Sequence, residues 1–245
     1  MKKLSLLLLY FFLQCSTLFA FNLEEGLWTD FSGTLGKTNF YLSLYRGNGD
    51  SVTGSYYTDG ATRKILVEGS FRNDVLFLKE KQTNKKLAIF KGKVYSTDQD
   101  DFIKGFRMER NGGQAQRFEM HVTAKVGGTA QKRYSDVSLT DEQVERFALD
   151  VKQAFLSDKK EWLAEQIAYP LTVRLNNGKK LDLQQAKDFI QNYSNIINAD
   201  FKKRLRVAGC FNLFHNYQGI MMGNGEIWLT SDAENKKMVV MGMNN

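Results

Sequence analysis

Hydrophobic and polar residues alternate with a period of two through the first half of the chain. In the segment NFYLSLY, Phe40, Leu42 and Leu44 fall on one face, and tyrosine and serine side chains fall on the other. Turn-forming stretches such as RGNGD and TDGA interrupt this pattern at short intervals. The resulting candidate strands are GLWTDF, NFYLSLY, SVTGSYY, KILVEGSF, VLFLKE, LAIFKG, FIKGFRM and RFEMHVT.

Eight short strands joined by hairpins are enough to close an up-and-down barrel, which leaves no free sheet edge. No proline lies between Leu27 and Thr123 that would interrupt a strand ladder. We therefore predict an all-β domain over residues 21–123, in the form of an eight-stranded up-and-down barrel. A β-sandwich fits the same pattern and is the alternative.

The hydrophobic period changes after a polar, glycine-containing stretch at residues 124–138, which we interpret as a linker. Thr140 and Gln143 form a capping-box pair before apolar residues at helical spacing. Further helices are expected from near Asp182 and over residues 199–207. An α+β domain over residues 139–245 is completed by strands around residues 171–175, 211–214, 218–222, 226–229 and 238–241.

The segments GLWTDF, VTGSYY, VEGSF, IFKG and IKGF resemble, in order and spacing, the strands of avidin-like barrels in the wider lipocalin-like group. The resemblance covers most of the predicted barrel and implies a ligand site at the barrel mouth. The residues that it implies as ligand-binding are Asp30, Thr34, Tyr56, Thr58, Phe90 and Phe106. Phe90 and Phe106 stand where avidins use tryptophan, and Asp30 stands where asparagine is usual. The resemblance therefore implies an adapted pocket or a filled barrel, and not a tight biotin site.

In the second half, AYPLTV and QGIMMGNGEIWL resemble the C-terminal modules of exported bacterial proteins in the NTF2-like group of cone-shaped α+β domains. This resemblance implies a curved sheet wrapped around helices, often with a cavity. The group includes enzymes, binding proteins and scaffolds without catalysis, so it adds a shape and no reaction. The expected fold is thus two domains, an all-β eight-stranded up-and-down barrel followed by an α+β NTF2-like cone.

The first twenty residues have the layout of a cleaved secretory signal peptide. Lys2 and Lys3 precede an apolar run that is too short to span a bilayer, and small and polar residues follow up to Ala20. Cys15 would permit lipoprotein anchoring, but Gln14 stands where that signal has a small residue. We therefore expect residues 1–20 to be removed, the protein to be periplasmic or secreted, and no transmembrane segment to remain.

The chain is basic, with 34 Lys and Arg residues against 27 Asp and Glu residues and a formal net charge of +7. The densest basic cluster is FKKRLR at residues 201–206, where helical spacing places Phe201 and Leu205 on one face and the cations away from it. A solvated helix face is the first interpretation, and contact with an anionic polymer or lipid is the second. Nucleic acid is not an expected partner, because the chain is exported and no aromatic residues are interleaved with these charges.

The glycine-rich stretch NYQGIMMGNGEIWLTS raises the question of a ligand loop. Glu226 follows Gly225 where a phosphate-binding loop needs lysine and a hydroxyl, and no helix is expected after it. Asn224-Gly225 is instead typical of a two-residue hairpin turn between strands. We predict a hairpin at this position, with Trp228 packed against a helix.

No metal site or cofactor is predicted. His121 and His215 are the only histidines, and neither has a second ligand at metal-binding spacing. Cleavage after Ala20 would remove Cys15 and leave Cys210 without a disulfide partner, as a buried thiol.

These observations favour an exported, non-catalytic binding or envelope-associated protein. Its expected partner is a small apolar or mixed-polarity ligand, held in the barrel mouth or in the cone, or an envelope protein. The alternative is a small-molecule enzyme of NTF2-like type, with isomerase- or dehydratase-like acid–base chemistry in the C-terminal cavity. The candidate catalytic residues for that alternative are His215, Tyr217 and Asp200.

Overall fold

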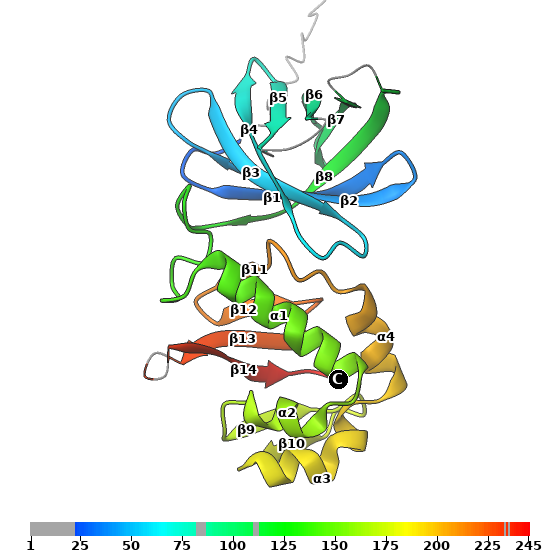
Figure 1. Cartoon of the computed structure of the whole chain (residues 1–245), viewed down its shortest axis with the longest axis vertical. Coiled ribbons are helices and arrows are strands. Elements are labelled where there is room, and N and C mark those ends of the chain that lie inside the picture. The colour runs from blue at the N-terminus through cyan, green and yellow to red at the C-terminus, as the bar shows by residue number, and fades with distance from the viewer. Residues whose placement is uncertain (1–22, 82–86, 110–112, 233, 235) are drawn as a thin grey trace, which may run out of the picture.

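The N-terminal half forms a closed antiparallel β-barrel, coloured blue to green in Figure 1. This computed structural model describes residues 23–81, 87–109, 113–232, 234 and 236–245. The expected signal peptide, with Cys15, lies outside the described residues. The strands of the barrel are β1 (Trp28–Leu35), β2 (Thr38–Arg46), β3 (Ser51–Thr58), β4 (Ile65–Arg72), β5 (Val75–Glu80), β6 (Ala88–Ser96), β7 (Asp101–Glu109) and β8 (Gln116–Val126).

Antiparallel pairing of β1 with β8 closes the ring. Each strand also pairs with its neighbours in sequence, and Leu35 of β1 lies opposite Phe118 of β8. The turns carry the expected residues, including Gly49 and Gly60, whose φ angles are positive. The prediction of an eight-stranded up-and-down barrel is therefore confirmed, and the sandwich alternative is wrong.

Side chains that alternate along the strands fill the interior of the barrel. The ring of Phe40 has the rings of Tyr56, Phe90 and Phe118 around it, at centroid distances of 5.1, 5.8 and 6.5 Å. All four residues are buried. Gly105 makes room for Phe118, because a Cβ atom at position 105 would lie 2.8 Å from its ring. The interior is thus a packed core, as in other small eight-stranded barrels.

The C-terminal half is an α+β region that begins with helices, as predicted. Its helices are α1 (Asp141–Leu156), α2 (Lys160–Glu165), α3 (Ala186–Ile196) and α4 (Ala199–Val207). Its strands are β9 (Leu171–Arg174), β10 (Lys180–Leu183), β11 (Phe214–Asn216), β12 (Gly219–Met222), β13 (Ile227–Asp232) and β14 (Lys237–Met243). Strands β11 to β14 form one antiparallel sheet, and β9 and β10 form a smaller one. Helix α1 lies across the larger sheet (Figure 1), and Val151 and Leu229 are fully buried in the core between them.

The capping box predicted before α1 is present. The Thr140 hydroxyl accepts a hydrogen bond from the backbone N–H of Gln143, and the Gln143 side chain accepts one from the N–H of Thr140. The helix expected from near Asp182 begins only at Ala186, because the residues around Asp182 pair with β9 as strand β10. None of the helices in the described part of the chain has the length and apolar character needed to cross a membrane.

The glycine-rich stretch forms a hairpin, as predicted. Met222 of β12 lies opposite Ile227 of β13, and the residues between them form the turn. The turn is longer than the expected two residues because the Glu226 carboxylate folds back and accepts a hydrogen bond from the backbone N–H of Asn224, at 2.6 Å. Trp228 was expected against a helix, but it is half-buried and lies on the sheet face that points away from the helical core.

The segment 124–138, predicted to be a linker, is packed between the two halves. Strand β8 extends to Val126, and Arg133 and Tyr134 are each only 1 % exposed. The segment has a polar composition because hydrogen bonds and an ion pair, and not apolar contacts alone, hold it in place. The division into domains at residues 21–123 and 139–245 stays a prediction.

Candidate functional site

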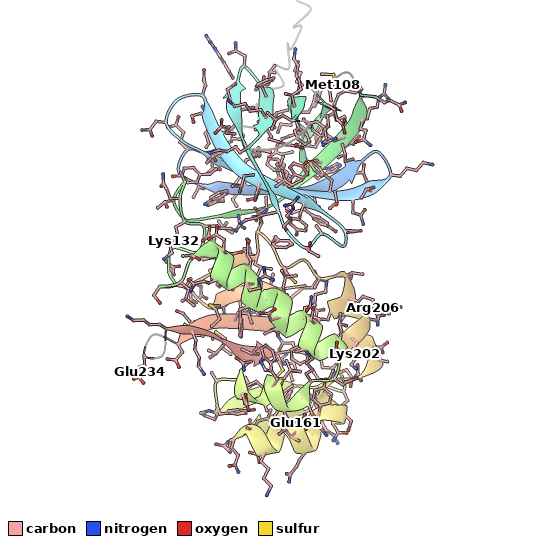
Figure 2. All side chains as sticks on the ribbon, viewed as in Figure 1. Met108, Lys132, Glu161, Lys202, Arg206 and Glu234 are labelled. Atoms are coloured by element: carbon pink, nitrogen blue, oxygen red, sulfur yellow. The ribbon has the colours of Figure 1, made fainter. Side chains whose placement is uncertain are left out.

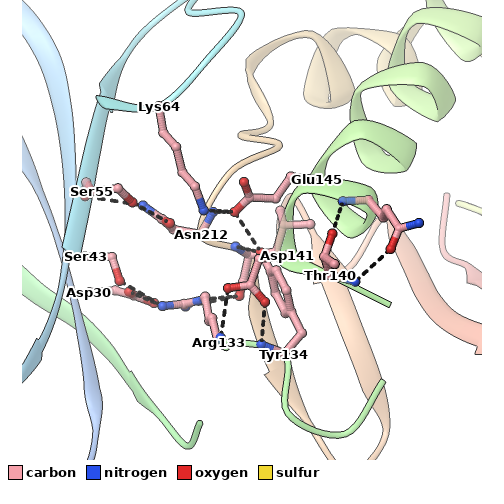
Figure 3. A network of polar contacts seen from close by, with 12 residues as sticks. Asp30, Ser43, Ser55, Lys64, Arg133, Tyr134, Thr140, Asp141, Glu145 and Asn212 are labelled. Carbon is pink, nitrogen blue, oxygen red and sulfur yellow. Dashed lines mark hydrogen bonds and ion pairs between the residues drawn. The ribbon is translucent and has the colours of Figure 1, made fainter. Parts of the chain in front are cut away.

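A network of polar side chains crosses between the barrel and the α+β region (Figure 3). Arg133 donates to both carboxylate oxygens of Asp30 on β1, at 2.9 and 2.6 Å, and to the Ser43 hydroxyl on β2, at 2.8 Å. Its Nε and Nη2 atoms also donate to the carbonyl of Leu213, at 3.1 Å each. These bonds use all the N–H donors of the guanidinium group. Arg133 is therefore a structural link, with no donor left for a ligand.

A second branch of the network centres on Glu145, a buried residue of α1. Its carboxylate accepts hydrogen bonds from the Lys64 ammonium group, at 2.8 Å, and from the backbone N–H of Asn212, at 2.9 Å. The side-chain oxygen of Asn212 accepts in turn from the Ser55 hydroxyl on β3, at 3.0 Å. Burial raises the pKa of Glu145, and the charge of Lys64 opposes this shift. Figure 3 shows Lys64 and Ser55 reaching this cluster from the barrel side.

Asp141, at the start of α1, fixes the segment that carries Arg133. Its carboxylate accepts hydrogen bonds from the backbone N–H groups of Arg133, at 2.8 Å, and of Tyr134, at 3.2 Å. The Tyr134 hydroxyl accepts from the N–H of Leu213, at 2.8 Å, and burial raises the pKa of this phenol well above its ordinary value. Because its members bind one another, this network holds the two halves together and is not itself a reactive site.

Two clefts beside the network share a wall made of stacked tyrosines. Tyr41 and Tyr57 project from the outer face of β2 and β3, with ring centroids 4.8 Å apart and planes inclined by 17°. Phe211 of the α+β region packs edge-to-face with Tyr57, with ring centroids 5.4 Å apart and planes inclined by 63°. The two tyrosines line both a cleft of about 320 Å³ and a cleft of about 400 Å³. These volumes are typical of small-molecule sites, which often lie between packed units.

Polar groups accompany the aromatic wall of the clefts. Asp59 accepts a hydrogen bond from the Tyr41 hydroxyl, at 3.1 Å, and Lys152 donates to the carbonyl of Ala208, at 2.6 Å. Burial, and then the charge of Asp59, raises the pKa of Tyr41, and burial also raises that of Tyr57. Both phenols are therefore protonated at neutral pH. Other polar side chains at the clefts are Thr58, Arg206, Asn212 and Asn224.

Two of the six residues expected at the barrel mouth, Tyr56 and Phe90, lie inside the barrel. The Tyr56 hydroxyl donates to the carboxylate of buried Glu80, at 2.5 Å. Arg107 donates to the same oxygen, at 3.1 Å, and its guanidinium group lies 5.8 Å from the centre of the Phe90 ring. Burial, and then Glu80, raises the pKa of Tyr56 far above its ordinary value. The charges of Glu80 and Arg107 thus compensate each other, and the Tyr56 hydroxyl adds a hydrogen bond.

The other four expected residues do not join Tyr56 and Phe90. Asp30 and Thr34 lie on the outer face, because β1 turns Phe31 toward the interior and neighbouring residues of a strand face opposite ways. Phe106 is also on the outer face, and Thr58 lines the larger cleft. The structure therefore does not bring the six residues together at one mouth. Ligand binding by any of them stays a prediction.

The three candidate catalytic residues are only partly brought together. His215 is buried, and its Nε2 atom lies 3.2 Å from the carbonyl oxygen of Gly127. His215 and Tyr217 line a common cleft of about 370 Å³, although Tyr217 is 93 % exposed. Asp200 is exposed in the first turn of α4 and does not line this cleft.

Sequence reasoning missed Arg133, Lys64 and the pair of Tyr41 and Tyr57. The sequence gives no signal of a structural role for Arg133, because this residue belongs to a polar stretch without hydrophobic periodicity. A signal for the tyrosines was present, since the outward positions of β2 and β3 carry tyrosine and serine side chains and few charges. A strand face of this composition indicates cover by another part of the protein.

The described residues include no group of three or more His, Cys, Asp or Glu side chains that could hold a metal ion. Cys210 is a free, buried cysteine, and burial raises the pKa of its thiol to about 11. This thiol is therefore a poor nucleophile at neutral pH.

Comparison with known proteins identifies no family, because no family model and no curated protein matches this chain. A function for this protein has to be inferred from its polar network, its clefts and its surface charges.

Proposed function

We propose that the protein is a non-catalytic binding protein whose small ligand occupies the clefts between the barrel and the α+β region. The observation that carries this proposal is the stacking of Tyr41 on Tyr57, which gives both clefts one rigid aromatic wall. The barrel acts as a filled support, because its interior is occupied by packed aromatic rings. The ligand then binds outside the barrel and not within it.

The side chains around the clefts favour a ligand of mixed polarity. The tyrosine wall and Phe211 suit a planar or apolar body. Lys152 and Arg206 line the larger cleft and suit an anionic group, while Asp59 accepts hydrogen bonds there. A molecule with an aromatic or apolar body and an acidic or hydroxyl-bearing edge fits this arrangement.

The wider relationships of the two halves form part of the same proposal. A closed eight-stranded antiparallel barrel supports an avidin-like or lipocalin-like, calycin-type origin for the first half. Helices followed by a four-stranded antiparallel sheet, with α1 packed on it, support an NTF2-like origin for the second half. Export to the periplasm or beyond, and a role at the envelope, rest on the signal-like composition of residues 1–20.

The test is native mass spectrometry of the protein purified from an extract of its own cells. The wild type is expected to carry a bound small molecule, and Tyr41→Ala is expected to lose it. The matched control is Tyr45→Ala, because Tyr45 lies on the same face of β2 but packs on Trp28, at 5.5 Å, and lines neither cleft. A wild type without added mass, or equal retention in both variants, would contradict the proposal.

A small-molecule enzyme that uses His215 is the second candidate, and one observation favours it. Burial, and then the charge of Arg133, lowers the pKa of His215, so its imidazole is neutral at pH 7, as a general base requires. Tyr217 lines the same cleft and could supply a proton. Isomerase or dehydratase turnover that His215→Ala abolishes and Tyr41→Ala retains would support the enzyme over the binding protein.

A further inference from the structure

The outer face of strands β5 to β8 carries aromatic and cationic side chains in alternation. The strand registers place Phe77 opposite Lys91, Lys91 opposite Phe106, and Phe106 opposite Arg117. These four residues, one from each strand, form a line across the sheet in which neighbours are about 4.8 Å apart. We call them the β5–β8 row. All four are exposed, and the two phenylalanines are 40 % and 43 % exposed.

Positive charge predominates around the row. Lys93 and Lys104 lie opposite each other on β6 and β7, and Lys104 forms an ion pair with Glu119, at 3.1 Å. Within the described part of the chain, Lys91, Lys93 and Arg117 have no carboxylate partner. At neutral pH this face therefore presents cations that are free to bind an anionic partner.

The carboxylates that border this face are mostly engaged. Glu68 forms an ion pair with Lys79, at 3.0 Å, and Asp100 contacts the imidazole of His121. Asp98, in the turn between β6 and β7, is exposed and marks one border of the basic surface. The centre of the row thus keeps its positive charge.

The row lies at the end of the molecule that is far from the α+β region. Figure 1 shows β5, β6 and β7 at the opposite end of the long axis from α3. Figure 2 likewise shows Met108 of β7 far from Lys202 and Arg206 of α4. A broad surface can therefore approach the outside of the barrel here without meeting the helices or the tyrosine-walled clefts, and a hollow of about 430 Å³ beside Phe106 and Arg117 opens toward it.

Three aromatic rings on this face, those of Phe106, Phe102 and Tyr95, are already covered on a flat side. The guanidinium group of Arg117 lies 5.6 Å from the centre of the Phe106 ring, and the Lys104 ammonium group lies 4.8 Å from that of Phe102. Tyr95 stacks on Phe102, at 5.3 Å and 18°. Rings covered in this way are poor platforms for bases or sugars, which bind nucleic-acid and sugar sites by stacking. Their edges remain free to enter the headgroup layer of a membrane, where aromatic residues and lysines are favoured.

We propose that the β5–β8 row docks the barrel on an anionic lipid bilayer. Phe77 and Phe106 enter the headgroup layer, and Lys91 and Arg117 bind the lipid phosphates on either side of Phe106. The convex shape of the barrel places the central strands β6 and β7 closest to the lipid. The clefts between the barrel and the α+β region lie on the opposite side of the barrel and stay in water, so docking and ligand binding are independent of each other.

The test is co-sedimentation of the full chain with vesicles of phosphatidylcholine, with and without phosphatidylglycerol. Binding is expected only with phosphatidylglycerol, and it should weaken as salt is added. Lys91→Ser combined with Arg117→Ser is expected to lower the partition coefficient about 25-fold, since each cation near an anionic surface contributes a factor of about five. Phe106→Ser keeps every charge and should also weaken binding, which distinguishes docking from a purely electrostatic association.

The matched control is Lys180→Ser combined with Lys187→Ser, which removes two exposed cations from β10 and α3 at the other end of the molecule. It is expected to change the partition coefficient less than about twofold, because these residues lie beyond the Debye length of about 8 Å from the bilayer. Equal losses in the two double variants would overturn the proposal, as would equal binding to vesicles without phosphatidylglycerol. Binding of the row to soluble dextran sulfate, with no binding to either vesicle, would assign it to an anionic polymer instead. Thermal melting of each variant verifies that the barrel is intact.

Discussion

Arg133 and Asp30 form a two-point ion pair between the segment that follows the barrel and the first strand of the barrel, with N–O distances of 2.9 and 2.6 Å. The arginine side chain is 1 % exposed and the aspartate side chain 14 %. Because the Arg133 charge cannot be rehydrated in place, removal of the Asp30 charge leaves it buried without compensation. The pair therefore makes the stability of the barrel depend on the segment that follows it.

Asp30→Asn is expected to lower the free energy of unfolding by about 3–5 kcal/mol. The matched control is Glu119→Gln, which breaks an ion pair whose partners, Lys104 and Glu119, are 48 % and 46 % exposed. That change should cost less than about 1 kcal/mol, because exposed pairs contribute little. Urea denaturation of the full chain measures both changes. Equal losses in the free energy of unfolding would show that the buried pair contributes no more to stability than the exposed one.

Gly105→Ala is expected to destabilise the barrel by about 3 kcal/mol, the upper end of the usual cost of overpacking. A Cβ atom there would lie 2.2 Å from the carbonyl oxygen of Lys91 and 2.8 Å from the ring of Phe118. Gly127→Ala is the control, since no atom lies within 4 Å of the added carbon, and it should change stability by no more than about 0.5 kcal/mol. Thermal denaturation compares the two, and similar melting temperatures would contradict the close packing of β6 and β7.

Mild acid is expected to destabilise the protein through His215. Burial, and then the charge of Arg133, lowers its pKa below the ordinary 6.5, so the unfolded chain binds a proton at pH values where the folded chain does not. The contribution of His215 to stability is therefore fully present above pH 6.5 and falls as the pH drops toward the folded-state pKa. Glu145, whose pKa is raised, acts with the opposite sign.

The comparison that isolates His215 is denaturation of the wild type and His215→Gln at several pH values between 8 and 5.5. The wild type should lose more stability than the variant over this range, because only the wild type has the imidazole. Parallel pH profiles would mean that His215 is not held neutral by its surroundings.

Brief digestion of the native chain with trypsin tests the connection between the two halves. The bond after Arg133 should be spared, because Arg133 and Tyr134 are buried. Cleavage is expected earlier at exposed sites such as Lys179, in the turn between β9 and β10. Mass spectrometry identifies the first fragments. An early cut after Arg133 would contradict the packed segment and support the flexible linker predicted from the composition of residues 124–138.

The barrel and the first helix of the C-terminal half were predictable because their signals are local. Alternation of residues such as Phe40, Leu42 and Leu44 defines a strand face, and Thr140 and Gln143 define a helix start within four residues. Strand alternation also predicts that Asp30 points outward, because its neighbour Phe31 points inward. The resemblance to a ligand-binding barrel instead implied that Asp30 lies at the barrel mouth.

The polar network was not predictable from the chain, since its partners are far apart in sequence. Asp30 and Arg133 are separated by 103 positions, and Ser55 and Asn212 by 157. The local sequence around each of these residues is typical of an ordinary solvent-exposed polar position. Only the packing of the α+β region on the outer face of β2 and β3 brings them together.

The way in which the barrel closes also determines how the chain can fold. All strand pairs of the barrel except one join consecutive strands, and these hairpins can form from local contacts. The exception is β1 with β8, in which Trp28 lies opposite Val126. Until β8 arrives, the growing sheet has two unpaired edges that can capture another chain. The period of greatest risk for aggregation during folding therefore begins with the first hairpins and ends when β8 pairs with β1.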